Sequence, residues 1–158
     1  MKPHDVDIDD YHKTVQRFHE ETDRAAAVLA GSYMENYLVK FIKHYTITDK
    51  DSNNWFDRDG PFSTFYQRIT TAYAFKLIPE SIKKDLTYIC KIRNHFAHHP
   101  FDASFDESPV IDWLCHLNYP QTDIEALEPT NREKYLLTIS MCIVRMHNVM
   151  AKNNAKCS

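Results

Sequence analysis

The sequence contains very few glycines, and this scarcity constrains the fold more than any other feature. Only two occur in 158 residues, Gly31 and Gly60, against seven prolines. A sheet-rich fold needs more glycine than this, because its hairpins and bulges place residues at positive φ. The shortage therefore favours helices.

Apolar residues recur every three or four positions along most of the chain, which is the spacing of one helical face. Thr130 and Glu133 form a capping-box pattern before the last apolar run, and Pro100 disfavours helical conformation at His99. The pattern predicts helices over residues 7–21, 23–45, 62–76, 79–98, 108–117 and 130–152, joined by polar loops over 46–59, 101–107 and 118–129. We therefore expect an all-α fold, a single helical bundle of about five to six helices.

Length and composition indicate one folded unit. The chain of 158 residues fits the usual size of one domain, roughly 100–200 residues. Hydrophobic residues make up 43% and charged residues 26%, both typical of globular proteins. We expect a single domain over residues 1–158, with a polar tail from about Asn153.

Charge and hydropathy indicate where in the cell the protein is expected and which binding partners are unfavourable. The formal net charge of -3 argues against a surface that grips nucleic acid everywhere, so any phosphate site is expected to be local. The chain has no run of about 18 apolar residues, and its acidic N-terminus lacks an apolar stretch. These features predict a cytoplasmic protein with no membrane segment. The four cysteines lack zinc-ligand spacing and are expected to be reduced, buried thiols.

One segment gathers most of the chemistry. Lys91, Arg93, His95, His98 and His99 lie within nine positions at the end of the helix predicted over 79–98. Histidine exchanges protons near neutral pH, and arginine offers a planar fork for phosphate oxygens. These groups suit attack by a ribose 2′-hydroxyl on its own phosphodiester, a reaction that requires no metal and no cofactor.

Helix geometry complicates this arrangement. Arg93 and His98 are five residues apart, so an ideal helix separates them by about 140° around its axis. They would converge only if the helix end distorts or if a second subunit contributes. A twofold homodimer would place two copies of the segment in one cleft.

The segment resembles the signature of a known family. Arg93-Asn94, followed after three residues by His98, is similar to the Arg-(x4-6)-His motif of HEPN domains, in which a polar residue commonly follows the arginine. HEPN domains are small helical bundles, often dimeric, and many are metal-independent endoribonucleases of toxin–antitoxin and phage-defence systems. The resemblance implies that Arg93 and His98 form the catalytic pair and that Asn94 supports them. We assign Lys91, His95 and His99 to substrate binding.

A second resemblance covers nearly half of the chain, from about Val28 to His98. It is to the MltR (mannitol operon repressor) family, and it rests on Gly31-Ser32 with Glu35 and Leu38, on Asp59-Gly60-Pro61-Phe62, on Arg68-Ile69, Ala72-Tyr73 and Leu77-Ile78, and on Asp85-Leu86 and Ile92-Arg93-Asn94. The resemblance implies an all-helical domain associated with repression of a sugar operon, without an obvious DNA-reading motif. Residues beyond Pro100 are similar to neither family.

Three functions are compatible with these features. The leading hypothesis is a metal-independent endoribonuclease that acts on RNA as a homodimer, with an antitoxin as a possible partner. The alternative is a non-enzymatic regulator that represses transcription through a protein partner. A third is a module that binds a nucleotide or phosphate ligand without cleaving it.

Structural explanations compete with each functional one. Arg93 would serve equally as a surface arginine paired with an acidic side chain, and Glu35 is a candidate partner for it. His98 would serve as a helix cap, since cations near a helix C-terminus are favourable by about 0.3–1 kcal/mol. A metal site at the histidines lacks carboxylate or cysteine neighbours. The aromatics considered for stacking RNA bases are those in predicted loops: Trp55, Phe56, Phe101 and Phe105.

Overall fold

Six α-helices and one short 3-10 helix make up the part of the chain that the structure, a computed structural model, describes: residues 8–47, 51–119 and 128–156. The helices are α1 (Ile8–Glu20), α2 (Asp23–His44), α3 (Phe65–Ala74), α4 (Glu80–His98), α5 (Val110–Leu114) and α6 (Asn131–Lys156), and the 3-10 helix is η1 (Ser52–Phe56). No strand occurs in these ranges. The prediction of an all-α bundle is confirmed.

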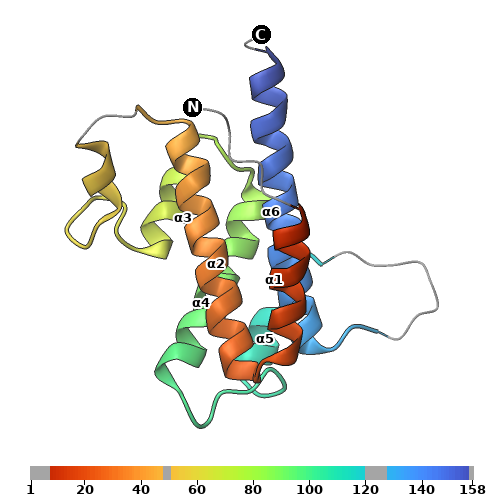
Figure 1. Cartoon of the computed structure of the whole chain (residues 1–158). Coiled ribbons are helices and arrows are strands. Elements are labelled where there is room, and N and C mark those ends of the chain that lie inside the picture. Colours follow the sequence, from red (N-terminus) through yellow and green to blue (C-terminus); the bar gives the residue numbers. More distant parts are fainter. Residues whose placement is uncertain (1–7, 48–50, 120–127, 157–158) are drawn as a thin grey trace.

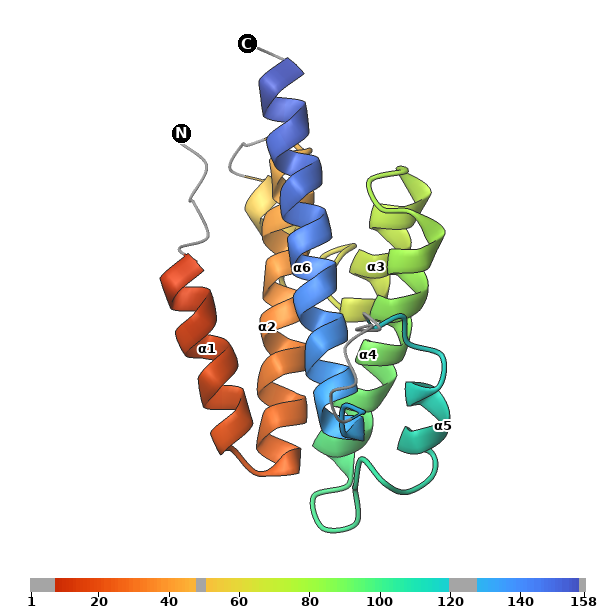
Figure 2. The same ribbon diagram turned by 90° about the vertical axis from the view of Figure 1, so that its right-hand side faces the viewer.

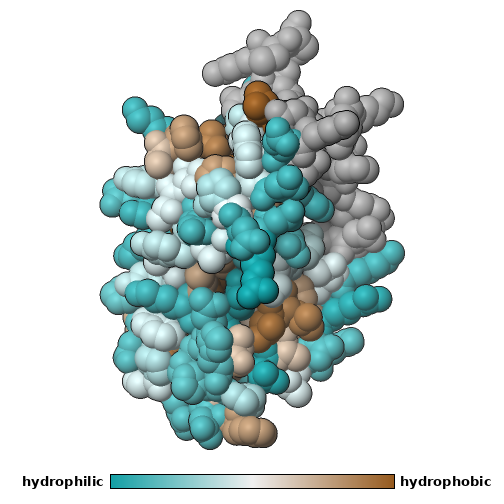
Figure 3. All heavy atoms as spheres, turned by 90° about the vertical axis from the view of Figure 1, so that its left-hand side faces the viewer, coloured by the Kyte–Doolittle hydropathy of each residue, from teal (hydrophilic) through white to brown (hydrophobic). Residues whose placement is uncertain are grey.

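Three long helices form the centre of the bundle. α2 packs on both α4 and α6, and α4 also contacts α6 (Figure 1). α1 covers the outer side of α2, α3 lies against α2 and α4, and α5 packs on α4 and α6 (Figure 2). Large buried side chains from the three central helices fill the core, among them Phe41, Phe96 and Tyr135. The face drawn in Figure 3 is mainly hydrophilic, with apolar atoms in small separate groups.

Short sequence patterns predicted two helix ends correctly, the end of α4 and the start of α6. α4 ends at His98, one residue before the position that Pro100 disfavours. At the start of α6, Thr130 N donates to Glu133 Oε2 at 2.7 Å and Glu133 N donates to Thr130 Oγ1 at 3.2 Å, so the predicted capping box is confirmed.

Three predicted helices have wrong boundaries. The helix expected over 108–117 spans only Val110–Leu114, because Ser108 Oγ bonds to the Asp112 side chain and does not cap the helix, whose N-cap is Pro109. α3 begins at Phe65 rather than near Phe62, because Thr64 and Gln67 form a second capping box that starts the helix there. α6 continues to Lys156, so the polar tail expected from Asn153 is helical for four residues more. In the loop predicted over 118–129, residues 120–127 lie outside the described ranges.

The turn after α3 is a Schellman motif that lacks the usual glycine. Leu77 N donates to Ala72 O and Lys76 N donates to Tyr73 O, both at 2.9 Å. Lys76 adopts a φ of 58° at the position where glycine is preferred. A side chain in this left-handed conformation stores strain in the turn.

A buried carboxylate fastens the segment after α5 to α4. Asp85 is 1% exposed, and its Oδ1 accepts hydrogen bonds from Asn118 N and Asn118 Nδ2, both at 3.0 Å. Burial raises the pKa of Asp85, and the bonds from Asn118 oppose this rise in part.

The cysteines differ in exposure. Cys90 and Cys142 are buried, and burial raises the pKa of both thiols. Cys115 is exposed, with Sγ donating to Ile111 O at 3.3 Å. The expectation of burial is wrong for this residue, because α5 ends at Leu114 and Cys115 is its C-cap rather than part of a buried helical face. Cys157 lies outside the described residues. None of the described helices is both long enough and apolar enough to cross a lipid bilayer.

Candidate functional site

The end of α4 is a regular helix, which decides how its side chains are distributed. The helix includes His98, and the backbone N–H of His99 donates to His95 O at 2.9 Å. The distortion that would let Arg93 and His98 meet within one chain therefore does not occur. Five residues of regular helix place these two side chains on faces about 140° apart.

Arg93 belongs to a cluster of two arginines around one carboxylate. Glu35 Oε1 accepts from Arg68 Nη1 at 2.7 Å, and Glu35 Oε2 accepts from Arg93 Nη2. The side chains of Arg68, Glu35 and Arg93 are 10%, 18% and 20% exposed. Glu35 is thus the partner of Arg93, as the sequence indicated. Two cations share one carboxylate, so the cluster carries a net positive charge.

The two arginines differ in their remaining contacts. Arg68 also donates to three backbone carbonyls, those of Phe62, Phe56 and Ser63, at 2.7, 3.0 and 3.1 Å. Arg68 therefore fastens the η1–α3 loop to the bundle. Arg93 lies over the Phe65 ring at 5.5 Å, and its buried Nε has no hydrogen-bond partner among the described residues. Arg93 therefore makes fewer hydrogen bonds than Arg68.

A glycine makes room for Arg93. A β-carbon added at Gly31 on α2 would lie 2.6 Å from Arg93 Cγ, 2.7 Å from Arg93 Cβ and 2.8 Å from the Tyr135 hydroxyl oxygen. Real side chains do not tolerate such distances, so Gly31 allows α2 to pass α4 closely at this point.

The histidines of the segment lie on other faces of α4. His95 is half-buried, with its ring centroid 4.4 Å from that of His99 and 5.8 Å from that of Trp113. Partial burial, and then the neighbouring His99, lower the pKa of His95. His98, His99 and Lys91 are exposed, and Lys91 Nζ lies 4.9 Å from the centroid of the Tyr88 ring.

Asn94 contacts neither member of the predicted catalytic pair. It is half-buried, and its Nδ2 donates to Cys90 Sγ at 3.6 Å, one turn earlier on α4. This weak bond sets the orientation of the Asn94 side chain. Within a single chain, Asn94 does not orient Arg93 or His98.

Two residues near the segment escaped the sequence analysis. Arg24, at the start of α2, donates from Nε to Phe96 O at 3.2 Å and so brings a guanidinium to the end of α4. The role of Arg68 in the cluster was also missed, although the sequence placed it inside the MltR-like pattern. No local spacing relates these residues to α4, because helix packing alone brings them there.

The loop aromatics divide into packed and exposed groups. Phe105 is 1% exposed and packs between Phe96 at 4.7 Å and Tyr135 at 5.6 Å, so its candidacy as a base-stacking residue is contradicted. Trp55 and Phe56 are half-buried and contact Phe62. Of the four, Phe101 alone is fully open to solvent, at 94% exposure.

No metal-binding group is formed by the side chains that the structure describes, since no three His, Cys, Asp or Glu residues there are arranged around one point. Comparison of the chain with protein-family models, with curated proteins and with solved structures gives no match.

Proposed function

We propose that this chain is a metal-independent endoribonuclease whose site forms between the α4 ends of two copies. The observation that carries the proposal is that Arg93 and His98 project from different faces of one regular helix. Arg93 is held by Glu35 on one face and keeps part of its side chain open to solvent, at 20% exposure, while His98 is exposed on another face. A twofold axis beside α4 would bring Arg93 of one copy to His98 of the second copy, twice.

The chemistry needs only these side chains and the RNA itself. His98 takes the proton from a ribose 2′-hydroxyl, whose oxygen attacks the adjacent phosphorus, and the bond to the 5′-oxygen breaks as that oxygen takes up the proton that His98 then releases. The guanidinium of Arg93 stabilises the negative charge that builds up on the phosphate oxygens. A 2′,3′-cyclic phosphate and a free 5′-hydroxyl are the products.

One observation favours the alternative, a non-enzymatic regulator that acts through a protein partner. The bond from Arg93 to Glu35 accounts for the arginine as a structural element, with no substrate required. Several exposed apolar side chains on other parts of the surface would then be partner contacts: Ile47, Phe75 and Phe101.

Cleavage of RNA in the presence of EDTA tests the nuclease directly. Purified protein is incubated with total RNA, alongside Arg93→Ala, His98→Ala and the control His147→Ala. His147 is an exposed histidine on α6, so its loss matches that of His98 in chemistry and in cost to folding. We expect cleavage by the wild type and His147→Ala only. Intact RNA with the wild type, or full cleavage by His98→Ala, would favour the regulator.

Mixing two inactive variants tests whether the site is shared. In a dimer of one Arg93→Ala copy and one His98→Ala copy, one of the two composite sites is intact. Random exchange of subunits should therefore restore about a quarter of the wild-type rate. A site within one chain would stay inactive after mixing.

A further inference from the structure

The outer face of α4 carries an uninterrupted row of cationic and aromatic side chains. Its members are Lys84, Tyr88, Lys91, His95 and His98, and all are exposed or half-buried. Their spacing alternates between four and three residues, so they project from one side of the helix. From Lys84 to His98 this α4 row is about 21 Å long, at about 1.5 Å per residue.

Rings from α5 and from the turn that follows it lie beside the row at two levels. His116 stacks on Tyr88 with centroids 4.8 Å apart and planes inclined by 17°. Trp113 meets His95 edge-on at 5.8 Å. Tyr88 and His95 are seven residues apart on α4, so the two ring pairs lie about 10 Å apart along the helix. His116 is exposed and Trp113 half-buried, which leaves ring surface open to solvent.

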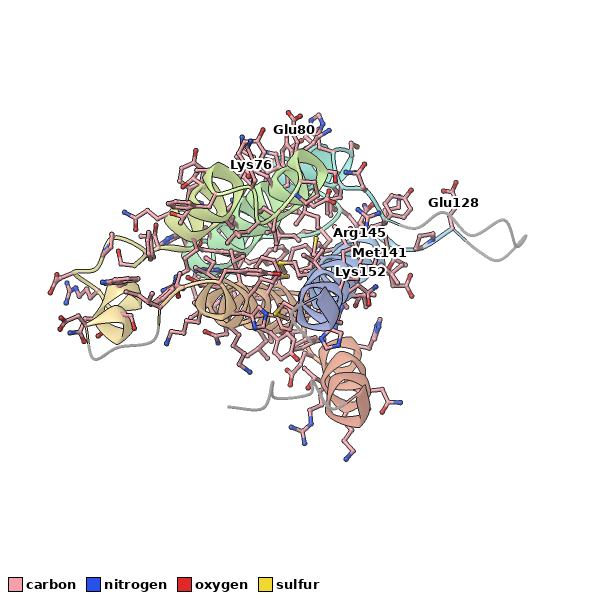
Figure 4. The ribbon with its side chains drawn as sticks, turned by 90° about the horizontal axis from the view of Figure 1, so that it is seen from above. Lys76, Glu80, Glu128, Met141, Arg145 and Lys152 are labelled. Carbon is pink, nitrogen blue, oxygen red and sulfur yellow. The ribbon has the colours of Figure 1, made fainter. Side chains whose placement is uncertain are left out.

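Between Lys84 and His98 the α4 row contains no carboxylate, although Glu80, one turn before Lys84, continues its line at the start of the helix. The acidic residues of α4 are Glu80, in its first turn (Figure 4), and Asp85, which points inward to Asn118. On α5, Asp112 accepts a hydrogen bond from Ser108 Oγ at 2.8 Å. The whole chain has 22 acidic and 19 basic residues, so the stretch of the row from Lys84 to His98, with two lysines and two histidines, is more cationic than the chain as a whole. Such a stretch on an acidic protein attracts a polyanion.

We propose that the α4 row binds single-stranded RNA. Lys84 and Lys91 contact phosphates, and the ring pairs Tyr88–His116 and His95–Trp113 stack on unpaired bases. Aromatic stacking combined with cationic groups along a track is how proteins hold single strands. The row ends at His98, so the further claim that the bound strand is the one to be cut rests on the proposed nuclease function.

The binding test uses a strand that the enzyme cannot cut. A fluorescent 2′-O-methyl oligoribonucleotide has no free 2′-hydroxyl, and its affinity is measured by anisotropy at several salt concentrations. The variant Lys84→Ala/Lys91→Ala is compared with Lys13→Ala/Lys152→Ala, which removes two exposed lysines from α1 and from α6, where Figure 4 labels Lys152. Loss of two phosphate contacts should reduce the slope of log K against log salt by about 1.4, and the control should leave it unchanged.

The stacking contacts are tested with Tyr88→Leu, which keeps an apolar side chain but removes the ring. Tyr66→Leu is the control, because Tyr66 is 58% exposed on α3. The Kd of the oligonucleotide should rise roughly 5- to 150-fold for Tyr88→Leu alone. Circular dichroism melting of both variants separates a lost contact from a lost fold, and the lysine variants give an answer even if Tyr88→Leu unfolds.

The outcomes separate this inference from the nuclease proposal. Row-dependent binding without cleavage of ordinary RNA supports the row and overturns the nuclease. Cleavage that is equal in the wild type and Lys84→Ala/Lys91→Ala supports the nuclease and overturns the row as the path of the substrate. Equal oligonucleotide affinity in the row variants and their controls overturns the row itself.

Discussion

Replacing Glu35 with glutamine tests how strongly its carboxylate stabilises the bundle. The change keeps the size of the side chain and removes the carboxylate that forms ion pairs with both Arg68 and Arg93. Breaking a fully buried ion pair costs about 3–5 kcal/mol. Here the three side chains are 10–20% exposed and Arg68 retains its bonds to backbone carbonyls, so we expect a loss of about 2–3 kcal/mol.

Urea denaturation and thermal melting measure this loss. For a chain of this size about 1 kcal/mol corresponds to 2–4 °C, so Tm should fall by about 4–12 °C. Asp23→Asn is the matched control, because it removes the carboxylate of the Arg132–Asp23 pair, in which Asp23 is 47% exposed. An exposed pair contributes less than about 1 kcal/mol. A Glu35→Gln loss no larger than that of Asp23→Asn would refute the reasoning.

Three further outcomes are expected. Lys76→Gly should raise the free energy of unfolding by about 0.5–1 kcal/mol in urea titrations, because glycine adopts positive φ without strain; a decrease would contradict the strain argument. Because folding raises the pKa of Asp85, its contribution to stability is full below the unfolded pKa near 4 and is lost as pH rises through the folded pKa. Asp85→Asn should therefore weaken the fall in the free energy of unfolding as pH rises just above 4. If the variant and the wild type show the same dependence on pH, Asp85 does not cause that fall. With the fourth cysteine replaced by serine, a thiol reagent should label Cys115 rapidly and Cys90 and Cys142 only on unfolding, whereas rapid labelling of all three would contradict their burial.

Some helix ends encoded by neighbouring residues were predicted correctly, although the Thr64–Gln67 box at the start of α3 was overlooked, and the burial of single loop side chains was not predictable. Pro100 and the Thr130–Glu133 box act within one turn of the chain, and both gave correct boundaries. The exposure of Cys115 and the burial of Phe105 depend instead on how α5 and the preceding loop lie on the bundle. Apolar spacing reports that a face is buried, but it does not report which loop side chains complete the core.

The sequence predicted which residues belong to the candidate site better than it predicted how they are arranged in space. Glu35 was a candidate partner of Arg93 because it lies on a helix turn with small residues. The sequence motif unites Arg93 with His98, yet a regular helix separates them, and only a second copy would reunite them. The α4 row has a visible spacing in the sequence, but its outward direction follows from the packing of α4 on α2 and α6.

The absence of a side chain at Gly31 also fixes the axial register of α2 against α4. Sliding one helix past the other by a turn, about 5.4 Å, would bring Ala27 or Glu35 to the point where even a methyl group collides with Arg93 and the Tyr135 hydroxyl. The close contact at Gly31 therefore disfavours a shift of α2 by one turn in either direction. In the observed alignment Glu35, one turn after Gly31 on α2, lies against the guanidinium of Arg93. The glycine that makes room for the arginine therefore also places the carboxylate that pairs with it.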